Sequence, residues 1–280
     1  MKHNLSFRTL CFVLSLLMCY TVLLSCSHSS EDDEEAPKNA YEETMPASIG
    51  ADSGLEREKG GRKDDIEQQE ATGHTICVDP GHGFVDGGCG EGFYSDGTLE
   101  KDINLAIAEK LSARLALLGY KVIQTHDGKN IPAADTNMNN IFSATERVTY
   151  INGLNIDYLI SIHVNAFDSD TSVSGMNIYY QQSYAKVNTW GATVAKYISE
   201  SIGEKVEGES APNVKDGTDP NTSFALTRDI NAASSLIEVG FVTNEDDAAD
   251  MVDPDWQQDV ANAIAAGIDK FFKEQDGVQQ

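Results

Sequence analysis

A shortage of cysteine and of basic residues limits what this chain can be. Cys11, Cys19 and Cys26 lie near the N-terminus, which leaves Cys77 and Cys89 for the rest of the 280-residue chain. Two cysteines are too few for a cysteine-rich zinc site or a disulfide-built fold, although they could pair or stay as thiols. Lys and Arg number 20 against 45 Asp and Glu, a formal net charge of -25 that argues against nucleic acid as a partner.

A long apolar run occurs only near the N-terminus. The run over residues 10–24 follows Lys2 and Arg8, which is typical of a secretion signal, and it is too short for a membrane span. It ends in Leu-Leu-Ser-Cys at residues 23–26, which resembles the lipobox of bacterial lipoproteins. We therefore expect a signal peptide over residues 1–25 and a lipidated Cys26. The alternative is an ordinary signal peptide with an incidental cysteine.

Residues 26–70 are polar and acidic and show no apolar periodicity, so we expect a flexible tether there. The acidic run over residues 31–35 resembles the export tags of some Bacteroidetes surface lipoproteins, or it is simply a solvated part of the tether. Together these segments predict a lipoprotein of the cell envelope, anchored in the outer membrane and facing the periplasm or the cell surface.

Residues 71–280 are expected to form one α/β domain, because strand-like runs alternate with helical patterns. The predicted fold is a twisted, mostly parallel sheet flanked by helices. Strands are expected at 75–78, 120–125, 157–163, 175–180 and 235–239, and helices at 100–118, from Ser143 onward, at 187–202 and at 255–272. Ser143 and Glu146 have the spacing of a capping box. The segment 204–223, rich in Gly, Pro and Asp, is expected to be a loop bordering the cleft.

Ionisable side chains stand at the ends of three predicted strands. His82 follows the first, His163 ends the central one and Glu238 lies near the end of the last, while Glu100 opens the first helix. Ligands gather at the carboxyl ends of strands in such sheets, so a metal site is expected on that rim. Two imidazoles and a carboxylate suit a catalytic zinc, and a further carboxylate suits proton transfer.

Each of these residues also has a structural interpretation. A lone histidine at a sheet edge is more often structural than a ligand, and Glu100 could simply favour the helix dipole. Glu238 is harder to explain in this way, since a carboxylate buried in an apolar strand is costly unless it is paired or functional.

Four segments resemble, in the family's order, the signature blocks of the zinc-dependent N-acetylmuramoyl-L-alanine amidases. They read VDPGHGFVDGG, LEKDINLAIAEKL, SIHVNAF and IEVGFVTN, and the resemblance runs from about residue 75 to about residue 272. It implies that His82, Glu100 and His163 bind one Zn2+ per chain and that Glu238 is the catalytic carboxylate. The implied reaction is hydrolysis of the amide between N-acetylmuramic acid and the L-Ala of the stem peptide, by zinc-activated water on peptidoglycan.

Four further residues are candidates for orienting the metal ligands or contacting substrate. Asp79 and Asp86 either orient His82 or brace the turn, and an Asp before Pro-Gly is ordinary turn chemistry, so we favour the structural interpretation of Asp79. Arg147 either meets a stem-peptide carboxylate or braces the fold. Asn165 follows closely after His163.

Three residues depart from the family pattern. Phe84 stands where a second glycine usually follows the His-Gly pair, Cys89 where a small residue is usual, and His126 where an arginine is common. Two other functions stay open: a zinc peptidase or deacetylase on the same rim, and a peptidoglycan-binding lipoprotein without catalysis. The sequence shows no wall-binding repeat, so recruitment would fall to the membrane anchor, to a protein partner such as an activator, or to the cleft.

Overall fold

The computed structural model describes residues 71–278, apart from residues 92, 95, 131–139, 182–189 and 219–222. The predicted signal peptide, Cys26 and the acidic tether lie outside the described residues. The chain divides into residues 1–62 and residues 63–280, and the fold lies in the second unit. Among the helices of the described part, none combines the length and the hydropathy needed to cross a membrane.

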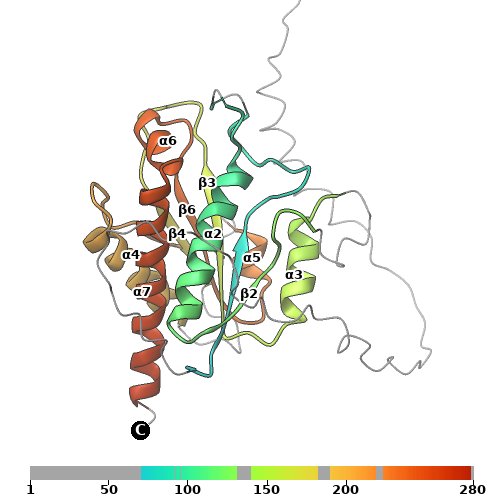
Figure 1. The fold of residues 1–280 in the computed structure, drawn as a ribbon, viewed down its shortest axis with the longest axis vertical. Coiled ribbons are helices and arrows are strands. Elements are labelled where there is room, and N and C mark those ends of the chain that lie inside the picture. The colour runs from blue at the N-terminus through green and yellow to red at the C-terminus, as the bar shows by residue number, and fades with distance from the viewer. Residues whose placement is uncertain are drawn as a thin grey trace, which may run out of the picture. The chain divides into compact units, whose positions relative to one another are not determined.

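A six-stranded sheet with the order β2-β1-β3-β6-β4-β5 forms the centre of the domain (Figure 1). The strands are β1 (Thr75–Pro80), β2 (Lys121–Gln124), β3 (Tyr158–Asn165), β4 (Asn177–Tyr180), β5 (Asn213–Asp216) and β6 (Ala233–Phe241). All neighbouring strands pair in parallel except β4 and β6, which are antiparallel. The predicted single α/β domain with a mostly parallel sheet is confirmed.

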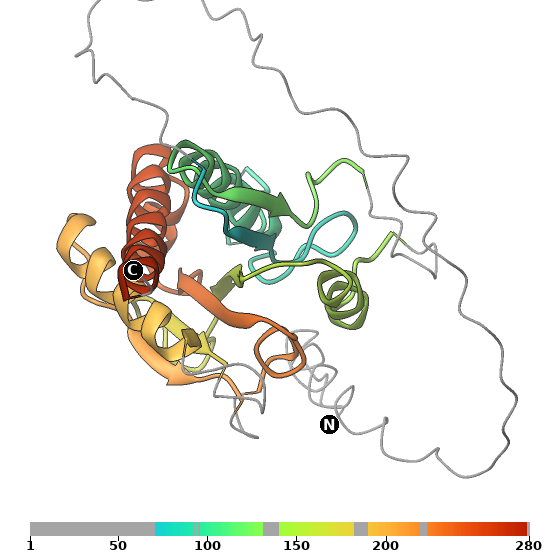
Figure 2. The same cartoon turned by 90° about the horizontal axis from the view of Figure 1, so that it is seen from below.

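Helices cover both faces of this sheet (Figures 1 and 2). On one face lie α2 (Glu100–Leu117), α4 (Trp190–Lys205) and α7 (Pro254–Val278). On the other lie α3 (Ala144–Asn152) and α5 (Ala225–Arg228), while α6 (Glu245–Met251) follows β6. Strand side chains alternate between the faces, so Ile76 and Val78 join the larger core and Cys77 joins a smaller cluster with Ile151 of α3.

The starts of two helices follow from local hydrogen bonds. The Glu146 amide donates to Ser143 Oγ at 3.4 Å, and the Ser143 amide donates to the Glu146 carboxylate at 3.0 Å, so the predicted capping box is confirmed. At the start of α2 the Leu99 amide donates to the Asp102 carboxylate at 3.0 Å. This bond fixes the first turn of α2, and therefore the place of Glu100.

The expectation of a loop over residues 204–223 is only partly right: residues 206–212 and 217–218 are irregular, but the segment also contains the end of a helix and a short strand. Helix α4 continues to Lys205, and β5 pairs in parallel with β4 at the edge of the sheet. The four residues of β5 alternate between exposed and half-buried, and Val214 is the only aliphatic side chain among them. An edge strand of this composition carries no apolar pattern that would distinguish it from a loop. The short helices α5 and α6 were not predicted either.

Candidate metal centre

The carboxyl ends of β1, β3 and β6 lie side by side at one edge of the sheet. The register between β3 and β6 pairs His163 with Glu238. After β1 the Gly81 amide still donates to the Ile162 carbonyl at 2.8 Å, so His82 follows directly beyond the strand end. This edge is where parallel sheets gather their ligands.

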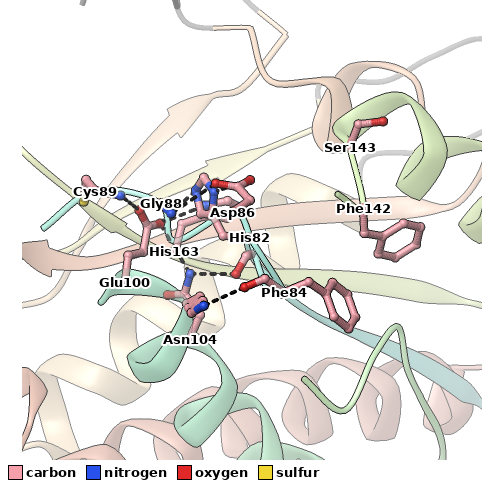
Figure 3. A network of polar contacts seen from close by, with 12 residues as sticks. His82, Phe84, Asp86, Gly88, Cys89, Glu100, Asn104, Phe142, Ser143 and His163 are labelled. Carbon is pink, nitrogen blue, oxygen red and sulfur yellow. Dashed lines mark hydrogen bonds and ion pairs between the residues drawn. The ribbon is translucent and has the colours of Figure 1, made fainter. Parts of the chain in front are cut away.

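Glu100 joins the two histidines at this edge. Its Oε1 lies 3.3 Å from His82 Nε2 and 3.1 Å from His163 Nδ1. One ligand atom from each residue lies within 4.8 Å of the others (Figure 3). Glu100 is 3% exposed, whereas both imidazoles are only partly buried. The three residues predicted to bind the metal are therefore brought together, with the histidines open on one side.

Several donors hold the Glu100 carboxylate in place. The Cys89 amide donates to Oε2 at 2.7 Å, and the Val164 amide donates to Oε1 at 3.0 Å. The side chain of Asn104, which is fully buried, donates to Oε1 at 3.3 Å and to the Gly81 carbonyl at 3.1 Å (Figure 3). The sequence analysis did not identify Asn104. Its position four residues after Glu100, on an otherwise apolar helix face, would have predicted a contact between the two side chains.

Two glycines of the turn leave the space that the ligands occupy. A Cβ added at Gly81 would lie 2.3 Å from His163 Cε1, and one at Gly88 would lie 2.4 Å from Glu100 Oε2. His82 itself adopts a left-handed φ of 62°, which residues other than glycine rarely do. The glycine-rich turn thus packs directly against two of the candidate ligands.

Asp86 lies against the outer nitrogen of His82. The distance from His82 Nδ1 to Asp86 Oδ2 is 2.9 Å, and the Gly88 amide donates to Asp86 Oδ1 at 3.1 Å. A carboxylate in this position fixes the orientation of an imidazole and leaves its other nitrogen, here Nε2, directed toward Glu100.

The charges at this site favour a cation. Burial alone would lower the pKa of His82, but hydrogen bonds and charge from Asp86 and Glu100 raise it to about 10. Burial alone would raise the pKa of Glu100, but His163 and His82 hold it well below its usual range. The carboxylates here therefore stabilise positive charge between them, which either protons or a metal ion can supply.

Glu238 is buried beside this cluster. Its side chain is 7% exposed, and its Oε2 has no hydrogen-bond partner among the described residues. Burial raises the pKa of Glu238 to about 7; the charge of Glu100 adds to the shift and the two histidines oppose it. A buried carboxylate without a partner is costly, so this position indicates a function rather than a role in stability.

Arg147 and Asp79 form a buried ion pair that braces the turn from behind. Arg147 Nη1 donates to Asp79 Oδ1 at 2.6 Å and to the Pro80 carbonyl at 2.9 Å, and Nη2 donates to the His82 carbonyl. Both side chains are buried, and Asp79 also accepts from Thr125 Oγ1 at 2.6 Å. Of the two interpretations of Arg147, these contacts match the bracing of the fold, and they match the structural interpretation of Asp79.

Asn165 ends β3 close to the site. Its Oδ1 accepts from the Ala166 amide at 2.8 Å, and its carbonyl accepts from the Val242 amide at 2.8 Å. These bonds fix the chain where the register between β3 and β6 shifts after His163. The geometry of Asn165 therefore shows a local structural role.

Two of the three departures from the family pattern are in contact. The rings of Phe84 and His126 lie 5.1 Å apart, and His126 Nε2 lies 2.8 Å from the Pro80 carbonyl. Phe84 adopts a φ of 58°, and its carbonyl accepts from Lys101 Nζ at 2.6 Å. Burial, together with the charge of Arg147, lowers the pKa of His126, which keeps this buried imidazole neutral.

Both cysteines of the described part are free thiols. Cys77 is buried in β1, whereas Cys89 is partly exposed and its Sγ donates to the Val164 carbonyl at 3.3 Å. Cys77 and Cys89 therefore do not form a disulfide in this structure. Cys89 contacts Glu100 through its backbone amide. A small residue at this position would make the same hydrogen bond, so the cysteine side chain does not change it.

Comparison with known proteins agrees with this geometry. A family model described as N-acetylmuramoyl-L-alanine amidase matches residues 76–270. The N-acetylmuramoyl-L-alanine amidase LytC of Bacillus subtilis is 28% identical over 203 residues, which are 72% of this chain but 36% of LytC. The germination-specific N-acetylmuramoyl-L-alanine amidase of the same organism is 31% identical over 207 residues, which are 72% of this chain and 81% of that protein.

A solved structure shares the fold as well. The CwlD amidase from Clostridioides difficile, in complex with the GerS lipoprotein, aligns with a TM-score of 0.60 and 30% identity, covering 72% of this chain and 99% of that chain. The family match spans well over half of the present chain and contains all four residues of the candidate site. The chain therefore belongs to the N-acetylmuramoyl-L-alanine amidase family.

Proposed function

We propose that this protein is a zinc-dependent N-acetylmuramoyl-L-alanine amidase that hydrolyses the amide between N-acetylmuramic acid and the L-Ala of the stem peptide in peptidoglycan. The observation that carries the proposal is the cluster of His82, Glu100 and His163 with Glu238 beside it. Membership of the family and the two named Bacillus subtilis amidases support it.

The donor set fits zinc. Two imidazole nitrogens and one carboxylate oxygen are a common protein contribution to a catalytic zinc site, in which the fourth position stays open. The buried Glu238 Oε2, which has no partner in the described part, adds a free acceptor on the residue that the sheet register pairs with His163. When bound, zinc would supply a water of lowered pKa and would polarise the amide carbonyl.

The side chains of this protein would do the positioning and the proton transfer. Asp86 orients His82, and the amides of Cys89 and Val164 hold Glu100. Glu238 would accept a proton from the attacking water and deliver it to the nitrogen of the leaving L-Ala. Its raised pKa suits both steps near neutral pH, because both protonation states are accessible there.

Digestion of defined muropeptides with metal-free and zinc-restored protein tests this function. We expect zinc to restore activity, and mass spectrometry to find intact stem peptides with a free L-Ala amine. The variant Glu238→Gln should keep stoichiometric zinc and lose activity by about 100-fold or more. Shortened peptides would instead indicate a peptidase, and loss of acetate would indicate a deacetylase. Binding without any product would indicate a peptidoglycan-binding lipoprotein without catalysis.

We further propose that the protein is exported and anchored in the outer membrane through Cys26. The basic start, the apolar run and the Leu-Leu-Ser-Cys segment support this location. The complex of the CwlD amidase with a lipoprotein supports a search for a protein partner, such as an activator. Metabolic labelling with a lipid precursor tests the anchor, and Cys26→Ser should abolish the label.

A further inference from the structure

A row of polar residues crosses the sheet at the level of the candidate metal centre. In the strand register, His163 of β3 lies opposite Glu238 of β6, and Glu238 lies opposite Asn177 of β4. Asn177 in turn lies opposite Asn213 of the edge strand β5. Because neighbouring strands are about 4.8 Å apart, the backbone of Asn177 lies about 5 Å from that of Glu238 and about 10 Å from that of His163.

The side chains of Asn177 and Glu238 lie on the same face of the sheet. Ile178 and Ile237, their neighbours along the two strands, both join the larger core. Since strand side chains alternate between faces, Asn177 and Glu238 lie on the opposite face. Side chains directly opposite each other on antiparallel strands have Cβ atoms about 4.5–5.5 Å apart. A group held at Glu238 is therefore within reach of the Asn177 amide.

The side-chain amide of Asn177 has no hydrogen-bond partner within the described residues. The side chain is only 5% exposed, yet its Oδ1 and Nδ2 are not among the fully buried, unpartnered atoms, so both still reach the surface. An amide with so little access to water is costly to fold unless a ligand supplies its hydrogen bonds. Asn177 and Glu238 are thus two adjacent buried side chains whose polar groups the fold leaves without partners in the described part.

The order of this row matches the order of groups in the proposed substrate. In the proposed reaction the carbonyl of the scissile amide lies at the metal ligands, and Glu238 delivers a proton to its nitrogen. The stem peptide continues from that nitrogen, and the sheet continues beyond β6 with β4. One peptide residue spans about 3.3–3.6 Å, so the next peptide group of the stem comes to the level of Asn177.

We propose that Asn177 is a substrate-binding residue that hydrogen-bonds the first peptide group of the stem, the amide that links L-Ala to the next residue. A side-chain amide suits this role because Nδ2 donates to a carbonyl and Oδ1 accepts from an N–H. The bond holds the leaving peptide in line with Glu238. The inference rests on the proposed amidase function, because it takes the scissile amide to lie between His163 and Glu238.

Three synthetic substrates test this role with full-length zinc-loaded protein. The first is N-acetylmuramoyl-L-Ala-D-isoglutamine. The second is its ester analogue, in which an oxygen replaces the N–H between L-Ala and the next residue. The third carries a free amine in place of the acetamido group of the sugar. The ester lacks the donor and has a weaker acceptor, so we expect its kcat/KM to be about fivefold lower than that of the peptide, the value of one hydrogen bond between neutral groups.

Two variants and one control assign this preference to Asn177. Asn177→Ala should remove the preference for the peptide over the ester and raise KM more than it lowers kcat, because the bond forms in the bound substrate and the transition state alike. Asn177→Leu, of similar volume, should give the same result without a gap in the structure. Asn213 is the same residue type in the same row, but it is exposed and one strand further from Glu238. Asn213→Ala should therefore keep the preference of the parent protein.

The third substrate separates two sources of a bound amide. If Asn177→Ala kept the preference for the peptide and instead removed the effect of the free amine, the residue would bind the acetamido group of the sugar, and the assignment to the peptide would be overturned. An equal loss of kcat on all three substrates, with the preference kept, would mean that Asn177 only supports Glu238. That result would overturn the assignment as well.

Failure of the proposed reaction is recognised by a separate binding measurement. Calorimetry compares the peptide with the ester on zinc-loaded protein. If neither compound is cleaved, but the peptide binds about fivefold more tightly and Asn177→Leu removes the difference, the reaction is wrong and Asn177 still binds the peptide group. Cleavage of both compounds with equal kcat/KM would overturn the role of Asn177 alone. Neither cleavage nor a difference in binding would overturn both.

Discussion

Replacing Asn104 by alanine tests whether the support of Glu100 governs zinc binding. The side-chain amide of Asn104 makes two hydrogen bonds, one to the Gly81 carbonyl at 3.1 Å and one to the Glu100 carboxylate at 3.3 Å. A bond to a neutral group contributes about 1 kcal/mol and one to a charged group about 1.5–3 kcal/mol. Because the bond to the Glu100 carboxylate is long, we expect the free energy of unfolding of zinc-free protein to fall by about 2–3 kcal/mol.

Zinc affinity should change for a separate reason. Without Asn104 the Glu100 carboxylate loses a donor that fixes its position between His82 and His163. Loss of such a partner typically lowers metal affinity by about 10–100-fold. Competition with a chromophoric chelator measures the affinity, and guanidinium denaturation without zinc measures the stability.

A matched variant separates the two effects. Gln257 is another buried amide, 6% exposed, that donates to the Met251 carbonyl at 2.8 Å and accepts from Lys110 at 3.1 Å. It contacts none of the candidate ligands, so Gln257→Ala should lower stability and leave zinc affinity unchanged. If Asn104→Ala also left zinc affinity unchanged while stability fell, the positioning role of Asn104 would be refuted.

Two further predictions follow from the turn and its brace. Gly88→Ala should lower zinc affinity at least about tenfold, because the added Cβ would lie 2.4 Å from Glu100 Oε2. The control is Gly97→Ala, since Gly97 also has a positive φ but has open space around it. This variant should lose only about 1 kcal/mol of stability and keep its zinc affinity. Burial opposes ionisation of Asp79, but the charge of Arg147 lowers the pKa of this carboxyl below its usual value. The ion pair therefore contributes its stability above about pH 4. Below that pH the free energy of unfolding falls by up to about 1.4 kcal/mol per pH unit. Asp79→Asn should flatten that slope in denaturation curves between pH 7 and pH 3, and an unchanged slope would contradict the pairing.

The central strands and several helix starts could be predicted because their signals are local. The apolar runs of β1 and β3 are buried on both faces, and Ser143 starts a helix through its own capping box. Edge strand β5 escaped prediction because Val214 is its only aliphatic residue. The antiparallel pairing of β4 with β6 depends on tertiary contacts that a strand pattern does not specify.

The candidate site could be predicted in part. His82, His163 and Glu100 were found from strand ends, a helix start and the family resemblance, and the structure brings them together. The ion pair of Arg147 with Asp79 joins residues 68 positions apart, so the sequence left two interpretations of that arginine open. The packing of Gly88 against Glu100 likewise needs three-dimensional coordinates, since a glycine-rich turn by itself shows no contact.

The ring contact between Phe84 and His126 has a consequence for substitutions at these two positions. The resemblance implies a different residue at each of these positions, and the two rings lie 5.1 Å apart. The two positions should therefore behave epistatically: restoring glycine at 84 alone leaves a gap over His126, and restoring arginine at 126 alone places a charge against Phe84. Exchanging both residues together is therefore expected to cost less stability than the sum of the two single exchanges.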